Sequence, residues 1–186
     1  GHDIRDYRLS DLRSLIGYVP QDQFLFASSI LDNVRFGNPD FSIDKVEEAT
    51  KLAQVYDDIK DMPEGFETII GEKGVSLSGG QKQRLAMSRA MILNPEILIL
   101  DDSLSAVDAK TEHAIIDNLK HTRKNKTTII TAHRLSAVVH ADLILVMQDG
   151  RIIERGRHDD LLAQGGWYAK TYESQQLEME GGEAHA

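Results

Sequence analysis

The feature that most constrains the fold is an aliphatic run, residues 97–100, that leads directly into two carboxylates, Asp101 and Asp102. A continuous apolar run of this length is typical of a strand in a parallel sheet whose two faces are both covered. A helical pattern over 108–125 and a second strand pattern over 127–133 follow it. Strand, helix and strand in this order imply a βαβ crossover, so the sequence predicts an α/β fold.

The remainder of the chain divides into a helical part and a hairpin part. Residues 23–94 are predicted to be mostly helical, and apolar residues at helical spacing predict one helix over 42–61. The segment 142–156 predicts a β-hairpin with an Asp-Gly turn at 149–150. Helix returns after the hairpin, and the acidic end, 177–186, predicts disorder.

Composition narrows the function classes. The chain has 186 residues, enough for one domain with a hydrophobic core, and it lacks an apolar run of about 18 residues that would span a bilayer. Lys and Arg total 21 against 30 for Asp and Glu, and the net charge of −9 argues against a nucleic-acid partner. The chain has no cysteine, which excludes disulfides and thiolate metal sites.

The two acids allow two interpretations. Ligands of open α/β sheets bind beyond the carboxyl ends of the strands. In the first interpretation the pair is a Walker B element, in which Asp101 holds Mg²⁺ and Asp102 positions an attacking water. Alternatively, one acid caps the next segment and the other faces water. Gln21 follows an earlier strand pattern, and its amide oxygen is a candidate ligand for the same metal.

Other candidate residues are also ambiguous when each is taken alone. LSGGQ, residues 77–81, combines glycines that let backbone N–H groups approach an anion with a helix N-terminus that favours negative charge. A flexible loop before a helix is the alternative. Asp108 precedes a predicted helix and His133 ends a strand pattern, so each also fits a hydrogen-bonded cap.

Taken in order, these motifs resemble the nucleotide-binding domain of ABC transporters. VPQD, LSGGQ, ILILDD, SAVD and TAHR are similar to its Q-loop, signature motif, Walker B, D-loop and H-loop. FLFASSILDNVRFG and GRIIERGRHDDLLAQGGWYAKTYESQ resemble flanking segments of exporters. The resemblance implies a truncated P-loop NTPase sheet flanked by helices over 1–176. A helical subdomain would occupy about 23–94 and the remainder of the ATPase core about 95–176, followed by the disordered tail.

The resemblance also implies ATP and Mg²⁺ as cofactors and a role for each motif. The residues that would bind ATP are Gln21, Ser78, Gly79, Gly80, Gln81, Asp101, Asp108 and His133. Asp101 and Gln21 would hold Mg²⁺. Asp102 and His133 would serve catalysis. Glu72, together with Gln21, would contact the coupling helices of a transmembrane domain.

The sequence departs from the family pattern in two places. The phosphate-binding loop G-x-x-x-x-G-K-[ST] does not occur, so the chain resembles the C-terminal two-thirds of the domain and is expected to lack ATPase activity alone. Asp102 stands where the family has Glu. Its shorter side chain withdraws the carboxylate by roughly 1 Å, and such a misplacement can cost on the order of 10²-fold in rate. Harmless drift is the alternative.

These departures favour the degenerate-site half of a heterodimeric exporter. Two such domains would pair head to tail at the cytoplasmic face of the cell membrane and drive export of drugs or lipids. The resemblance is to bacterial multidrug exporters. The alternatives are a non-transport ABC ATPase and a nonenzymatic interaction fragment.

Overall fold

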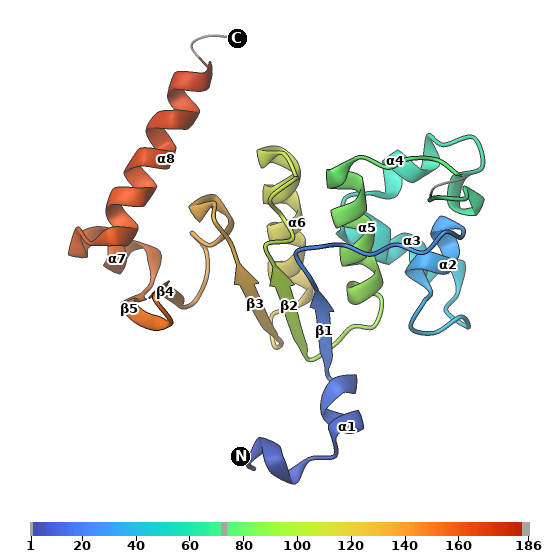
Figure 1. The fold of residues 1–186 in the computed structure, drawn as a ribbon, viewed down its shortest axis with the longest axis horizontal. Coiled ribbons are helices and arrows are strands. Elements are labelled where there is room, and N and C mark those ends of the chain that lie inside the picture. The colour runs from blue at the N-terminus through green and yellow to red at the C-terminus, as the bar shows by residue number, and fades with distance from the viewer. Residues whose placement is uncertain (1, 72–73, 184–186) are drawn as a thin grey trace. The chain divides into compact units, whose positions relative to one another are not determined.

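The computed structural model describes residues 2–71 and 74–183, which form helices and strands joined by loops (Figure 1). In chain order the elements are η1 (Ile4–Asp6), α1 (Leu9–Ser14), β1 (Ile16–Val19), α2 (Ile30–Val34), α3 (Ile43–Leu52), α4 (Tyr56–Lys60), η2 (Gly65–Glu67), α5 (Gly79–Met91), β2 (Ile97–Asp101), α6 (Ala109–Thr122), β3 (Thr127–Thr131), η3 (Leu135–Ala137), β4 (Ile144–Gln148), β5 (Arg151–Gly156), α7 (His158–Gln164) and α8 (Trp167–Glu183). They belong to two compact units, Gly1–Thr131 and Ala132–Ala186.

The first unit is built on a three-stranded parallel sheet in the order β1-β2-β3 (Figure 1). Ile97 at the start of β2 pairs with Ile16 of β1 on one side and with Thr127 of β3 on the other. The chain leaves β2, forms α6 and returns as β3. The predicted α/β fold with a βαβ crossover is therefore confirmed.

The central strand is fully covered on one face only. Leu98 and Leu100 have no exposed surface, whereas the residues that alternate with them are half-buried. Helix α5 packs close to β1 at Gly17, where an added Cβ would lie 3.3 Å from the carbonyl oxygen of Ala90. The sequence predicted that both faces of this strand are covered. Within the described residues, one face is fully covered and the other only partly.

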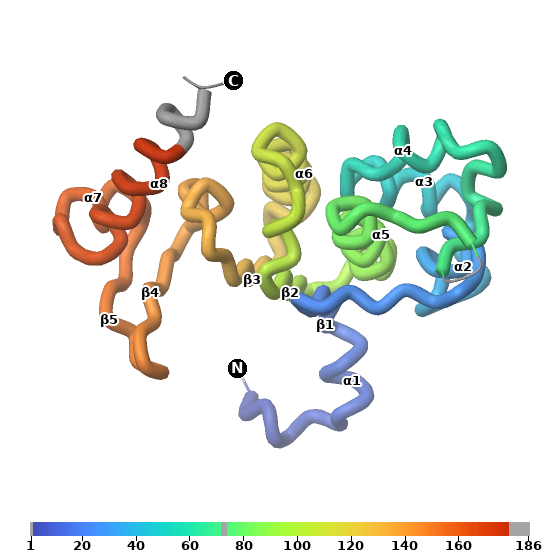
Figure 2. Tube along the Cα trace, turned by 45° about the horizontal axis from the view of Figure 1, so that its top comes forward, coloured from blue at the N-terminus to red at the C-terminus, as the bar shows by residue number. Residues whose placement is uncertain are grey.

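The named elements between β1 and β2 are all helices, but loops make up about half of this segment, which was predicted to be mostly helical. Helices α2, α3, α4 and α5 gather beside the edge strand β1 (Figure 2). The boundaries 23–94 and 95–176 of a subdomain and a core remain predictions. The two compact units of the structure meet instead between Thr131 and Ala132 in the chain. All three strands β1, β2 and β3 belong to one sheet, so residues before and after position 94 lie in the same unit.

The single helix predicted over 42–61 is wrong. The chain forms α3 and α4 instead, and between them Gln54 adopts a left-handed backbone conformation with φ 57°. The break points the carbonyl of Gln54 at the guanidinium of Arg84, which donates a hydrogen bond to it. The apolar spacing continues across the break, so periodicity alone could not reveal it.

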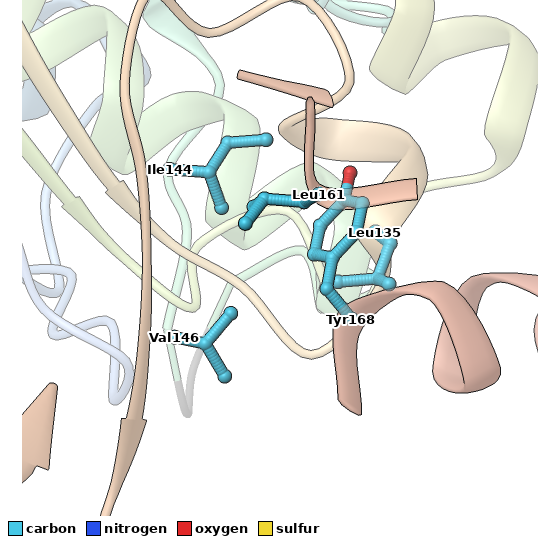
Figure 3. Close-up of a cluster of buried hydrophobic side chains, with 5 residues drawn as sticks. All are labelled: Leu135, Ile144, Val146, Leu161 and Tyr168. Atoms are coloured by element: carbon cyan, nitrogen blue, oxygen red, sulfur yellow. The ribbon is translucent and has the colours of Figure 1, made fainter. Parts of the chain in front are cut away.

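The second unit consists of a hairpin and two helices around a small core. Strands β4 and β5 pair antiparallel, and both residues of the predicted Asp-Gly turn have positive φ, 50° and 73°, as a type I′ turn requires. Side chains from η3, β4, α7 and α8 form the core (Figure 3). They are Leu135, Ile144, Val146, Leu161 and Tyr168.

The disordered tail expected over 177–186 stays a prediction; α8 is assigned as far as Glu183. Leu177 and Glu178 have high intrinsic helix propensity, which favours extension of a helix already formed upstream. The rest of the predicted tail, 184–186, lies outside the described residues.

Candidate functional site

The carboxyl ends of the three parallel strands bring polar side chains together at one edge of the sheet. Asp101 Oδ1 accepts a hydrogen bond from Thr131 Oγ1 at 2.7 Å, and Asp101 Oδ2 accepts one from Tyr18 Oη at 3.0 Å. Gln21 Nε2 donates to Asp102 Oδ2 at 3.3 Å. The structure thus assembles Gln21, Asp101 and Asp102, which the sequence predicted to share a site.

The chemistry of this edge fits a hard cation such as Mg²⁺. The hydrogen bond from Thr131, and then that from Tyr18, holds the pKa of Asp101 below its usual range, so the carboxylate is charged at neutral pH. The described residues contain no cluster of three or more His, Cys, Asp or Glu side chains suited to a metal. Mg²⁺ commonly takes one or two carboxylates and completes its shell with phosphates and waters, so Asp101 and its neighbours are a sufficient protein donor set.

Asp102 is held in an unusual backbone conformation. Its φ of 46° lies in the left-handed region, which Asp tolerates better than residues with longer side chains. Its N–H donates to the carbonyl oxygen of Thr131 at 3.1 Å and to Thr131 Oγ1 at 3.0 Å. This backbone geometry directs the carboxylate toward Gln21.

Sequence reasoning missed Tyr18 and Thr131 as members of this site. Thr131 lies directly opposite Asp101 in the pairing of β2 with β3. If the two predicted strands had been aligned in parallel register, the hydroxyl of Thr131 would have been predicted beside the carboxylate of Asp101. Tyr18 carries no comparable signal, because its contact depends on which face of the edge strand β1 it occupies.

The signature segment, 77–81, opens helix α5 through a capping box. Ser78 is the N-cap, and its hydroxyl accepts from Gln81 N at 3.2 Å. The Gln81 Oε1 atom accepts in return from Ser78 N at 3.0 Å. The capping box holds the two glycines between these residues at the helix start. Ser78 and Gly79 are exposed to solvent.

A second set of contacts ties the signature segment to α4. Asp58 accepts from Gln81 Nε2 at 2.9 Å and from Arg84 Nη1 at 2.7 Å, and Arg84 Nε donates to the carbonyl of Gly80 at 3.3 Å. Partial burial acts to raise the pKa of Asp58, but the hydrogen bonds from Arg84 and Gln81 outweigh it and the pKa is lowered. Both ends of the Gln81 amide are therefore used inside the chain, to fix the loop.

We expect the Asp58–Arg84 pair to stabilise the fold measurably. Both side chains are mostly buried, at 27% and 14% exposure, so Asp58→Ala or Arg84→Ala should each lower the free energy of unfolding by about 1–3 kcal/mol. The double variant should cost less than the sum by at least about 0.5 kcal/mol, measured by denaturant unfolding. Because the folded pKa of Asp58 is depressed, its contribution is complete above the unfolded pKa of about 3.9 and is lost as the pH falls below it. Strict additivity would contradict this pairing.

The other predicted residues occupy separate places. Asp108 is the N-cap of α6, where its Oδ1 accepts from Thr111 N at 3.0 Å, so the capping alternative is realised. His133 belongs to the second unit, where its carbonyl accepts from Gln175 Nε2 at 2.9 Å and the residue is exposed. It is not among the residues that the first unit assembles. Glu72 lies outside the described residues.

Comparison with known proteins defines the class to which this fold and site belong. A family model described as ABC transporter matches residues 1–105. The chain is 56% identical over 177 residues to the probable multidrug resistance ABC transporter ATP-binding/permease protein YheI of Bacillus subtilis, covering 95% of this chain and 30% of that relative. It is 49% identical over 179 residues to the multidrug resistance-like ATP-binding protein MdlA of Escherichia coli, covering 95% of this chain and 30% of that relative.

A solved structure gives the same result. The structure of a bacterial Atm1-family ABC exporter with ATP bound superimposes with a TM-score of 0.87 at 40% identity, covering 94% of this chain and 31% of that one. The chain belongs to the ABC transporter family and forms part of its nucleotide-binding domain. It spans 30% of the length of the two curated relatives described above.

Proposed function

We propose that the chain is the C-terminal part of an ATP-binding and ATP-hydrolysing motor domain of an ABC exporter. The observation that carries the proposal is the meeting of Gln21, Asp101 and Asp102 at the carboxyl edge of a parallel sheet. The relatives named as ATP-binding exporters support it. Because the sequence contains no G-x-x-x-x-G-K-[ST] loop, the isolated chain is expected to bind and hydrolyse ATP poorly.

The roles follow the chemistry of each group. Asp101, with Gln21, holds Mg²⁺, which neutralises charge on the phosphates when it is bound. Asp102 orients or deprotonates the attacking water. The family resemblance assigns to His133, two residues beyond the end of β3, a contact with the γ-phosphate. Thr131 and Tyr18 keep the Asp101 carboxylate charged and oriented through the hydrogen bonds described above.

The signature segment serves the site of a second half-transporter. In a head-to-tail pair, Ser78 and the backbone amides of Gly79 and Gly80 contact the γ-phosphate bound by the partner, while Gln81 holds them in place. Asp108 lies at the same interface. Since Asp102 replaces the usual Glu, this chain's own site is the slow one and the pair is a heterodimer. The partner's site carries most of the turnover.

The motor acts at the cytoplasmic face of the cell membrane and exports drugs or lipids. Both relatives reported above have names that refer to multidrug resistance, which supports drugs as the cargo class. Among the described residues, no helix has the length and apolar character needed to cross a membrane. By the family resemblance, Gln21 and Glu72 would contact the coupling helices of a transmembrane domain.

Asp101→Asn tests the metal role. In the full-length protein purified with its partner, the change removes the charge that holds Mg²⁺ but keeps the shape and an acceptor for Thr131. We expect turnover at this chain's site to fall by about 100-fold, with a raised Mg²⁺ requirement for ATP binding. Thr131→Val, which keeps the carboxylate, is the matched control and should have a smaller effect. Unchanged Mg²⁺ dependence in Asp101→Asn would rule out this site as the Mg²⁺ site.

A further inference from the structure

Helix α5 is fastened to the segment that follows the two acids through one buried amide. Gln83 is 4% exposed, and both ends of its side chain are bonded to this segment, residues 103–108. Its Nε2 donates to Ser105 Oγ at 3.1 Å, and its Oε1 accepts from Ala106 N at 2.9 Å. A glutamine bonded at both ends fixes the distance and the rotation between the two elements it joins.

A second contact beside Gln83 makes the junction tight. An added Cβ at Gly80 would lie 2.8 Å from the carbonyl oxygen of Ala106, so the signature glycine packs directly against the 103–108 segment. Gly80 and Gln83 are three residues apart and therefore lie on the same side of α5. The helix start cannot shift or rotate without displacing Ala106 or breaking the bonds of Gln83.

The same segment is attached to Asp102. The hydroxyl of Ser105 accepts from Gln83 and donates to the carbonyl oxygen of Asp102 at 2.8 Å. At its other end the segment reaches Asp108, the N-cap of α6. A short chain of bonds therefore runs from the signature helix, through Gln83 and Ser105, to the backbone of Asp102.

We propose that Gln83 is a positioning residue that couples the two ATP sites of the pair. This inference rests on the proposed function, in which Ser78 acts at the partner's site and Asp102 at this chain's own. A shift of the signature segment on nucleotide binding at the partner's site is transmitted through Gln83 to Ser105 and Asp102. Such coupling requires a continuous set of contacts whose arrangement both sites bias.

The test measures occupancy of each site separately. The full-length protein is purified with its partner, and both sites are labelled with a photoreactive azido-ATP without vanadate, so that label reports occupancy and does not depend on hydrolysis. Label on the partner then reports the partner's site, and label on this chain reports its own. Ser78→Ala should lower label on the partner and, through the coupling, lower label on this chain by about fivefold, the low end of measured coupling factors.

Gln83→Met keeps the side chain's length and removes both bonds. In that background, Ser78→Ala should still lower label on the partner but change label on this chain by less than about twofold. Ser105→Ala removes one partner of Gln83 at an exposed position and should weaken the coupling in the same direction, which keeps the test valid if Gln83→Met fails to fold. Lys82→Ala, at the exposed neighbour on α5, is the control and should leave the coupling intact.

The outcomes separate the inference from the function on which it rests. If Ser78→Ala lowers label on both chains whether or not Gln83 is replaced, Gln83 is only a structural contact and the inference is wrong. It is also wrong if Ser78→Ala affects the partner alone in the parent protein. If Ser78→Ala affects neither chain, the head-to-tail arrangement itself is overturned, and the inference with it.

Discussion

Gly79→Asp in the full-length protein is expected to lower ATP turnover at the partner's site by about 100-fold or more while the chain stays folded. The exposed N–H of Gly79 lies at the start of α5, where an anion is favoured. A carboxylate at this position would occupy that place and repel the γ-phosphate. The loss of an oriented donor to a developing oxyanion alone costs about 10²–10³-fold.

The structure explains why this change should not damage the fold. A Cβ at Gly79 would meet only Ala106 Cβ, at an ordinary 3.6 Å, and an acid in the first turn of a helix interacts favourably with its dipole. The melting temperature should therefore remain within a few degrees of the parent value. Gly80→Ala is the contrasting variant, because its Cβ would lie 2.8 Å from the Ala106 carbonyl and should lower stability. Full turnover at the partner's site with Gly79→Asp would contradict the role of this segment.

Asp102→Glu is expected to raise turnover at this chain's own site, by up to about 100-fold. The longer side chain advances the carboxylate by about 1 Å, and a misplacement of that size is enough to account for such a factor. Gln21, which donates to Asp102 Oδ2 at 3.3 Å, can adjust to the new position because it is exposed. Site-resolved single-turnover hydrolysis in the full-length pair measures the change.

The same substitution should carry a small cost in stability. Asp102 has φ 46°, and a Glu in the left-handed region loses about 1 kcal/mol relative to residues that tolerate it. For a domain of this size that corresponds to a fall of about 2–4 °C in melting temperature. Asp102→Asn, which preserves the backbone preference and removes the base, is the control and should lower turnover. An unchanged rate with Glu would show that Asp102 does not limit this site.

The sheet and the site at its strand ends were predictable from the apolar strand patterns and from their order along the chain. The run 97–100 and the strand over 127–133 could only be joined by a crossover, and parallel strands end at the same edge. Asp101 ends β2, Asp102 follows it directly, and Gln21 lies two residues beyond the end of β1. Their meeting was therefore implied by the order of the elements.

Contacts between side chains far apart in sequence could not be predicted in the same way. The bonds that Asp58 makes with Gln81 and Arg84 depend on the break at Gln54, where a left-handed residue interrupts a continuous apolar pattern. The contact of Gln83 with the 103–108 segment requires α5 to lie against that segment at a specific rotation. Neither is encoded in residue spacing, since each depends on how the elements pack.

The length of helix α8 could not be predicted from the amino-acid composition of the chain's end. The acidic, small-residue end of the chain reads as disordered, yet the helix continues to Glu183. Once a helix is nucleated, each added residue costs far less than the first turn, so a weak sequence can extend a strong one. A prediction from the composition of the tail alone does not include the effect of the helix that precedes it.

The most direct test of the account is a crosslink across the proposed interface. The chain has no cysteine, so Ser78→Cys adds one thiol to it at an exposed position, and a second thiol is placed in the phosphate-binding loop of the partner in the full-length pair. We predict that, with dissolved oxygen as the oxidant, a disulfide forms between the two chains when ATP is present and does not form in a parallel sample without ATP. A crosslink that is absent, or that is equally strong without ATP, would contradict the proposal that this chain completes its partner's ATP site.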